Sequence, residues 1–308
     1  MLVNESMPPS PVNPDPRAPT SQESLPNELF LYILIHLSPN TVYHCSVLSR
    51  RFYQLTIPYL WRYLQPSSLR SWQGIINTLR SPRAADYGPC VNRVDFSALS
   101  PWEAQQVTDG MLVTLLTECQ NIGELSLVRL QQLSAITLQQ VATRADKLEI
   151  LDLSACSQFS TGDLQTLFID PGTPSLRRYP KLTTIDLSSC SLGVSDNLIQ
   201  SIAHVAPRLR HLHLCRSGNV SDNALASVAQ HCPDLEVLVI TLPKGLIQSN
   251  KITDAAVRAL AQGCKKLKIV VGRGQTRVTD AGVAMLTKEC RGLERVDFSL
   301  KIPGNAEN

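Results

Sequence analysis

The segment RHLHLCRS carries the side chains of this chain that are best suited to metal chemistry. His211, His213 and Cys215 alternate along it, so an extended strand would place all three on one face. Imidazole and thiolate groups are the ligands that zinc prefers, and Asp186 on a neighbouring strand would add a carboxylate. A histidine pair falls short of the ligand count of a zinc site, so we predict no metal and interpret the pair as a pH-sensitive contact.

Catalytic motifs are missing from the sequence. The Gly-x-Ser-x-Gly, His-Glu-x-x-His and Walker patterns do not occur. The segment VVGRGQTRV places Gly272 and Gly274 after an expected strand, but the third glycine of a dinucleotide fingerprint is absent and glycine pairs are typical of turns. We therefore predict a protein that is not an enzyme and that needs no cofactor.

The composition excludes several other classes of function. The 308 residues include 29 basic and 26 acidic side chains, which nearly cancel, and no block of Lys or Arg indicates nucleic-acid binding. The apolar run at 29–37 is far shorter than the roughly 20 residues that span a bilayer, so we predict no membrane partner. The start MLVNESMPPS lacks a secretory signal, and nine cysteines without a C-x-x-C pair fit reduced thiols, so we expect a location in cytoplasm and/or nucleus.

Residues 24–64 predict three short helices with two apolar faces. The first helix carries one stripe at Leu25, Leu29, Ile33 and Leu37 and another at Phe30, Leu34 and Ile35. Ser38-Pro39 begins a second helix, and SRRFYQLT forms a third that Pro58 ends or kinks. A core of this size covers only one stripe, so we expect the other stripe to contact a second protein. The alternative is an ordinary three-helix cap on the following domain.

These residues resemble the F-box, the helical module that docks on a Skp-type adaptor of cullin-RING ubiquitin ligases. Leu25-Pro26-x-Glu28, Leu37-Ser38-Pro39, Arg50-Arg51-Phe52 and Leu60-Trp61 carry the resemblance. Thr41-Val42, Ser49 and Phe52 depart from the common Asp-Leu, Cys and Trp. The resemblance implies an adaptor-binding surface made of Leu25, Pro26, Glu28, Leu29, Ile33, Leu37, Val42 and Trp61.

The rest of the chain is one internal repeat. The pattern apolar-x-x-apolar-x-apolar begins at Val91, Ile122, Leu148, Leu182, Leu209, Leu235, Leu267 and Leu293, with steps of 26 to 34 residues. Ser or Thr, often followed by Asp, then opens a helix, because the hydroxyl suits a cap and the carboxylate suits the first turn. Each repeat therefore predicts a strand, a loop and a helix. Parallel strands stack about 4.8 Å apart whereas helices need roughly 8–10 Å, so the array must curve.

The repeat resembles the leucine-rich-repeat horseshoe, in the cysteine-containing subtype common behind F-boxes. Cysteines occupy two register positions, three residues before a start at Cys119, Cys232, Cys264 and Cys290 and eight after one at Cys156 and Cys190. They predict small buried spacers rather than metal ligands or catalytic thiols. The predicted fold class is α/β, a right-handed leucine-rich-repeat solenoid with parallel strands inside and helices outside, preceded by the three-helix F-box.

The predicted domain boundaries follow from these patterns. They are 1–23 for a disordered Pro-rich lead, 24–64 for the F-box, 65–90 for a linker helix, 91–299 for about seven to eight repeats and 300–308 for a tail.

The concave face is the predicted substrate-binding surface. Side chains two and four residues after each repeat start point away from the core leucines, because side chains alternate along a strand. The predicted substrate-binding residues are Asp95, Asp152, Asp186, His211, His213, Val237, Val239, Ile269 and Val271. An acidic first half and an apolar patch fit a substrate with a basic and an apolar part. The alternative is that the tail or the 242–252 loop covers the patch.

Three functional hypotheses follow. The first, implied by the resemblance, is the substrate-recognition subunit of an SCF-type ubiquitin ligase, with a Skp-type adaptor, and through it cullin and RING subunits, as partners and a protein substrate bound for ubiquitination and proteasomal degradation. The second is an interaction scaffold or inhibitor that binds through the repeats without promoting degradation. The third is a hydrolase or metal enzyme on a repeat scaffold, which no site in the sequence supports.

Overall fold

The computed structural model describes residues 26–168, 179–190, 193–217, 219–243 and 250–299. The Pro-rich lead, the tail and Leu25 lie outside the described residues, as does the middle of the 242–252 loop.

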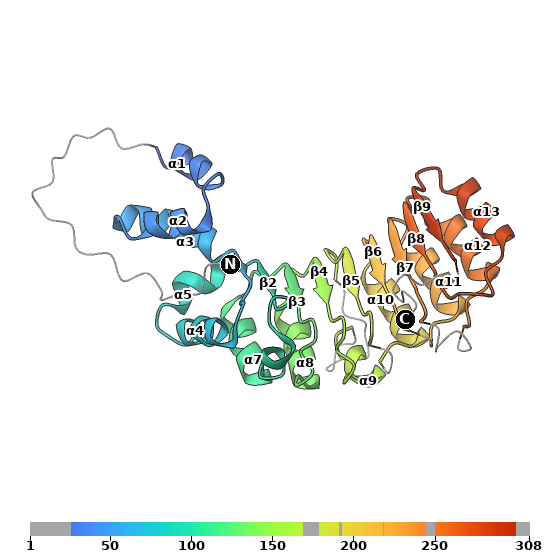
Figure 1. Ribbon diagram of the computed structural model, residues 1–308, viewed down its shortest axis with the longest axis horizontal. Helices are drawn as coiled ribbons and strands as arrows, with labels where there is room; N and C mark the ends of the chain where they lie inside the picture. The colour runs from blue at the N-terminus through green and yellow to red at the C-terminus, as the bar shows by residue number, and fades with distance from the viewer. Residues whose placement is uncertain (1–25, 169–178, 191–192, 218, 244–249, 300–308) are drawn as a thin grey trace, which may run out of the picture.

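One parallel sheet runs through the described part of the chain, and its nine strands follow in sequence order (Figure 1). The strands are β1 (Tyr63–Leu64), β2 (Arg93–Asp95), β3 (Glu124–Ser126), β4 (Ile150–Asp152), β5 (Thr184–Asp186), β6 (His211–His213), β7 (Val237–Val239), β8 (Ile269–Val271) and β9 (Arg295–Asp297). Strands β2 to β9 all begin two residues after a predicted repeat start, so the repeat register is confirmed. Strand β1 was not predicted, and it shows that the sheet begins at Tyr63, within the segment assigned to the F-box.

Helices cover one side of this sheet, and Figure 1 shows the F-box at one end of the array and α13 at the other. The helices after β1 are α4 (Leu69–Leu79), α5 (Ala84–Tyr87), the 3₁₀ turn η1 (Gly88–Cys90), α6 (Pro101–Ala104), α7 (Asp109–Glu118), α8 (Ala135–Arg144), α9 (Thr161–Gln165), α10 (Asp196–Val205), α11 (Asp222–His231), α12 (Asp254–Gly263) and α13 (Asp280–Glu289). The predicted linker helix is α4, whose Trp72, Ile75 and Leu79 are buried in the horseshoe core. None of the described helices is long and apolar enough to cross a membrane.

The F-box consists of α1 (Asn27–Leu34), α2 (Pro39–Ser46) and α3 (Arg50–Leu60), and it has a small core of its own. Phe30, Leu34 and Val42 are buried at its centre, and the ring of Phe30 lies 4.5 Å from that of Phe52. Ser38 caps α2 through its hydroxyl group, as the sequence predicts, and Ser49 caps α3 in the same way. Pro58 lies inside α3 and does not end it.

The F-box and the horseshoe share a continuous apolar junction. The C-terminal half of α3 contributes Ile57 to the horseshoe core, and Trp61 follows it into the same cluster. Trp61 stacks on Tyr87 with ring centroids 4.5 Å apart, and the hydroxyl groups of Tyr53 and Tyr87 share a hydrogen bond. The module that resembles an F-box is therefore packed directly on the repeats.

A ladder of carboxylates links neighbouring repeat helices. The Asp at the first position of one helix accepts hydrogen bonds from the backbone N–H and the hydroxyl of the residue that caps the next helix. The pairs are Asp109 with Ser134, Asp196 with Ser221, Asp222 with Thr253 and Asp254 with Thr279. Helices α8 and α9 begin instead with Ala135 and Thr161, so the ladder is interrupted on both sides of α9.

The register cysteines are buried, which confirms the prediction of small spacers. All six of them are almost fully inaccessible. The thiols of five of them, all except Cys119, donate to carbonyl groups of the preceding repeat, for example Cys156 Sγ to Leu127 O at 3.1 Å and Cys190 Sγ to Leu153 O at 3.0 Å. Burial raises the pKa of both thiols to about 12, so they stay protonated and unreactive at neutral pH.

Candidate protein-binding surfaces

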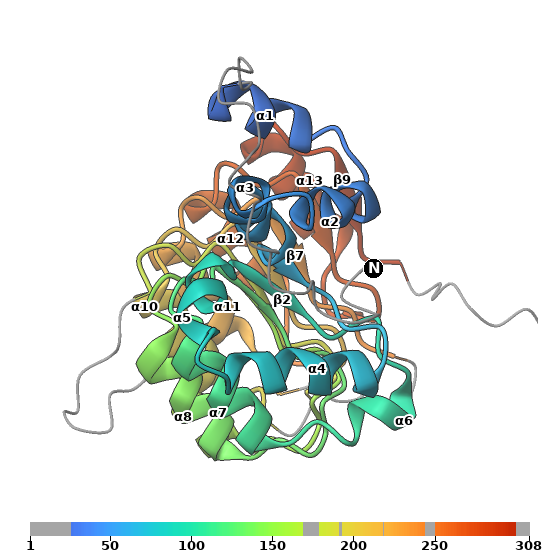
Figure 2. The same ribbon diagram turned by 90° about the vertical axis from the view of Figure 1, so that its left-hand side faces the viewer.

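Helix α1 leaves most of its apolar side chains uncovered. Its buried side faces the F-box core through Phe30 and Leu34, while the rest of the helix projects from the molecule (Figure 2). The exposed large apolar residues on and just after α1 are Leu29 at 53%, Leu31 at 44%, Tyr32 at 65%, Ile33 at 43% and Ile35 at 57% of their accessible surface. Exposed apolar surface of this extent on one short helix is typical of a protein-protein contact.

The predicted adaptor-binding residues separate into two groups. Pro26, Glu28, Leu29 and Ile33 are exposed and Leu37 is half-buried, whereas Leu25 lies outside the described residues. Val42 and Trp61 are buried, so they are corrected to core residues. Val42 completes the small F-box core, and Trp61 belongs to the horseshoe core because α3 carries it onto Tyr87.

Sequence reasoning missed part of this exposed surface. Ile35 was assigned to a stripe facing the core, but α1 ends at Leu34 and the turn that follows exposes Ile35. Leu48, for which the sequence pattern predicted no contact with a partner, is 68% exposed, because α3 begins only at Arg50. Both residues are exposed because they lie just outside the ends of a helix. The spacing of apolar residues does not indicate where a helix ends, so it could not predict this exposure.

The concave face brings the other predicted residues together in register. Asp186 pairs with His213 across β5 and β6, and Val239 pairs with Val271 across β7 and β8. The central residue of each strand points into the core, and the two flanking residues are half-buried on the open side from β3 to β8. The alternation that defined this face in the sequence is thus observed.

The aspartates of this face are engaged in local hydrogen bonds. Asp152 and Asp186 each accept a bond from the backbone N–H two residues on, at 2.8 and 2.7 Å, and both remain half-buried on the open side. Burial raises the pKa of the Asp152 carboxyl group. These side chains therefore shape the turn after each strand as well as lining the concave face.

Asp95 is corrected to a structural residue. It is only 8% exposed and accepts hydrogen bonds from the Tyr63 hydroxyl at 3.0 Å, the Gln65 amide at 3.1 Å and the Ser97 N–H at 2.8 Å. Burial opposes ionisation, but these bonds and Arg93 outweigh it and lower the pKa of the carboxyl group. The unpredicted strand β1 supplies Tyr63, which is why the sequence did not reveal this role.

The histidine pair lies on β6, in the middle of the face. His211 Nδ1 is 3.1 Å from the Thr184 hydroxyl, and burial together with the neighbouring His213 lowers the pKa of His211. Across the described residues no three His, Cys, Asp or Glu side chains are grouped so that they would hold a metal ion.

The apolar patch comprises Val237, Val239, Ile269 and Val271 on two neighbouring strands, all of them half-buried. Arg295 and Asp297 follow on β9, where Asp297 also contacts Arg273. The alternative that the tail or the 242–252 loop covers this patch concerns segments that fall outside the described residues in whole or in large part.

Comparison with known proteins finds family matches for two separate parts of the chain. The F-box-like family matches residues 22–66, and the leucine-rich repeats of an FBD-associated F-box protein match residues 164–281. A solved structure of similar fold belongs to the Rad7 and Elc1 complex in yeast, with a TM-score of 0.52 and 16% sequence identity, over 83% of this chain and 84% of that chain. The fold is thus an F-box-like region followed by a solenoid of the leucine-rich-repeat type.

Proposed function

We propose that this protein is the substrate-recognition subunit of an SCF-type ubiquitin ligase, in which the F-box docks on a Skp-type adaptor and the concave face of the repeats binds a protein substrate. The observation that carries the proposal is α1, which keeps Leu29 and Ile33 exposed although its other side has already built the F-box core. Such a surface favours burial against a partner, because apolar area removed from water contributes about 25 cal/mol per Å².

The chain makes no bond in this proposal, and its contribution is proximity. A substrate held on the concave face is tethered beside a ubiquitin-charged enzyme that the cullin and RING subunits carry, which raises its effective concentration there. The packed junction at Trp61 and Tyr87 supports this role, because it holds the F-box and the repeats in one relative orientation. We propose that the protein works in the cytoplasm or nucleus, where its nine cysteines would stay reduced.

Capture of a purified Skp-type adaptor tests the docking surface. We expect the double variant Leu29→Asp, Ile33→Asp to lose adaptor binding by at least about 100-fold, because two charges would be buried in an apolar contact. Ile136→Asp is the matched control, since Ile136 is equally exposed on α8 of the horseshoe. Unchanged capture by the double variant, with circular dichroism showing a folded chain, would contradict the assignment.

The degradative role is tested separately from docking. Proteins that associate with the chain in cells are identified first, and their half-lives are then compared in cells that carry the wild type or the double variant. A longer half-life with the variant supports the ligase function. Equal half-lives, with association retained, would instead identify a non-degradative scaffold.

A further inference from the structure

The last described repeat leaves its core positions open. The three apolar positions of the repeat pattern are buried in every earlier repeat, and Leu267 and Val270 of the preceding one are fully inaccessible. Their counterparts Leu293 and Val296 are only half-buried, as is Phe298, although all three pack against the same core. Each repeat of a solenoid is covered by its neighbour, so the repeat at the end of the array needs another cover.

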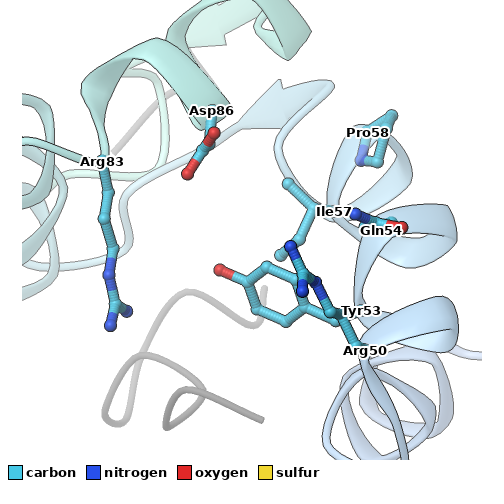
Figure 3. A pocket seen from close by; sticks show the side chains of 7 residues that line it. All are labelled: Arg50, Tyr53, Gln54, Ile57, Pro58, Arg83 and Asp86. Carbon is cyan, nitrogen blue, oxygen red and sulfur yellow. The ribbon is translucent and has the colours of Figure 1, made fainter.

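The opposite end of the array is covered by the F-box. Leu64 of β1 is fully buried, and Ile57 and Trp61 from the end of α3 belong to the same core cluster. Figure 3 shows Tyr53 and Ile57 of α3 facing Asp86 of α5 across a cavity of about 390 Å³ at this junction. The F-box therefore caps the array at its own end, whereas no described element follows β9.

The backbone of β9 offers hydrogen-bonding groups at the open end. The Arg295 N–H donates to the Lys268 carbonyl and the Asp297 carbonyl accepts from the Gly272 N–H, so both residues direct their backbone groups at β8. Because these directions alternate along a strand, the N–H and carbonyl of Val296 point at the other side. Among the described strands, β9 has β8 as its only neighbour. Such an edge is a template for pairing with one more strand.

The sequence of β9 is complementary to itself in the antiparallel direction. With a two-fold axis at Val296, Arg295 of each copy lies opposite Asp297 of the other, and opposite charges at opposed positions stabilise a strand pair. The Val296 backbone groups of the two copies then bond to each other. A parallel neighbour in the same register would instead set Arg295 beside Arg295.

The two charged side chains of β9 are placed for this pairing. The Arg295 side chain is 57% exposed, and its Nη2 atom lies 3.8 Å from Asp297 of its own chain, which is longer than a hydrogen bond. Arg273 contacts the Asp297 carboxylate at 2.6 Å. In the antiparallel pair that carboxylate would lie between Arg273 of its own chain and Arg295 of the other copy.

We propose that two copies of this chain associate through β9, with the two strands antiparallel and related by a two-fold axis at Val296. The contact joins the two sheets edge to edge and removes from water the apolar residues that the last repeat leaves half-buried. Because the F-box lies at the other end of each array, the two F-boxes would lie at the far ends of the assembly (Figure 1). The proposal depends on neither adaptor nor substrate binding, so it goes beyond the proposed function.

Sedimentation velocity of the full chain measures this association. We expect a species of twice the 33.9 kDa mass of one chain, whose share grows with protein concentration. Arg295→Glu should raise the dissociation constant about 10-fold, because it sets a carboxylate opposite Asp297 at two symmetric positions. Arg258→Glu is the matched control, since it changes the charge equally at an exposed site on α12 and should leave the constant unchanged. Circular dichroism checks that both variants fold.

Hydrogen–deuterium exchange locates the contact without any substitution. The peptide that contains β9 should exchange more slowly at a concentration where the dimer dominates than after dilution to the monomer, and the peptide that contains β5 should not change. This result, together with a dimer that Arg295→Glu alone weakens, supports the proposal.

Three outcomes would overturn it. They are a wild type that stays monomeric at every concentration, a dimer that Arg295→Glu leaves unchanged or that both variants weaken equally, and a dimer that protects segments other than β9. Slow exchange of the β9 peptide in a monomer at every dilution would show that the chain's own residues cover the edge, which would also exclude a second copy there.

Discussion

The carboxylate of Asp222 accepts two hydrogen bonds from Thr253, one from its backbone N–H at 2.7 Å and one from its hydroxyl at 2.6 Å. Asp222 begins α11 and Thr253 caps α12, so one side chain connects the starts of two successive helices. The Asp that begins α7, α10, α11 and α12 is therefore more than a favourable charge at its own helix terminus, because it also organises the next cap.

We expect Asp222→Ala to lower the free energy of unfolding by about 2–3 kcal/mol, because it removes two charge-assisted hydrogen bonds and leaves the Thr253 N–H without its acceptor. Urea denaturation followed by circular dichroism measures this change. Asp146→Ala, at an exposed loop carboxylate, is the control and should change the free energy by less than about 0.5 kcal/mol. Equal midpoints for the two variants would show that the ladder adds nothing to stability.

Two helical glycines should respond to alanine in opposite directions. A Cβ atom at Gly263 would lie 2.0 Å from the carbonyl oxygen of Ala229, so α12 would have to move away from α11. We expect Gly263→Ala to cost about 1–3 kcal/mol. Nothing lies within 4 Å of a Cβ at Gly74, which is exposed in the middle of α4, and Gly74→Ala should stabilise by about 0.5–1 kcal/mol. Thermal melts of both variants check the signs, and shifts of the same sign would refute the close packing of α11 and α12.

Thiol reactivity should follow burial. Cys45, Cys90 and Cys215 are partly accessible, whereas the six register cysteines are buried. Burial raises the pKa of the Cys232 and Cys264 thiols to about 12, so almost no thiolate is present at pH 8. We expect iodoacetamide at pH 8 to modify only the three accessible residues of the native chain, and all nine in guanidinium chloride, as read by peptide mass spectrometry. Rapid native modification at Cys232 or Cys264 would contradict this account.

Acid should weaken the last strand through Asp297. Hydrogen bonding from Arg273, with Nε and Nη2 both 2.6 Å from one carboxylate oxygen, lowers the pKa of Asp297 to about 2. The folded pKa lies below the unfolded value of about 3.9, so this contribution is present above pH 4 and is lost as the pH falls towards 2. We expect Asp297→Asn to be less stable than wild type at pH 6, with the difference fading near pH 2. Urea midpoints across this range measure it, and a difference independent of pH would exclude the carboxylate as its cause.

The sequence predicted the repeat register because the core is built from it. Strands β2 to β8 each have a buried central residue and Val296 of β9 packs against the same core, so apolar spacing alone located β2 to β9. Strand β1 escaped because Tyr63 and Leu64 directly follow the F-box and carry no repeat of their own. Because β1 brings Tyr63 next to Asp95, the Asp95 carboxylate accepts a hydrogen bond from Tyr63 and is buried instead of lining the concave face, which is why it was misassigned.

The contacts between one repeat and the next, and between the F-box and the repeats, could not be predicted from the sequence. Trp61 matches the F-box pattern by type, but which side it faces depends on how α3 meets the horseshoe. Likewise, Arg129 and Ala155 adopt left-handed backbone conformations with φ of 63° and 59°. Gly274 stands at the same place in its own repeat, and a glycine there would indicate such a conformation, whereas Arg and Ala do not. Their backbone N–H groups donate to the following repeat, and that geometry exists only in the assembled array.

The interruption of the carboxylate ladder around α9 divides the solenoid into unequal blocks. Repeat proteins gain their cooperativity from coupling between nearest neighbours, so a weak coupling is where cooperative unfolding separates. The helices α10 to α13 form one tied block, and the F-box with α4, α7 and α8 forms the other. A partner lying across the concave face at β4 and β5 would contact both blocks. Its binding would therefore favour the state in which the two blocks are folded together, and would oppose their separate unfolding.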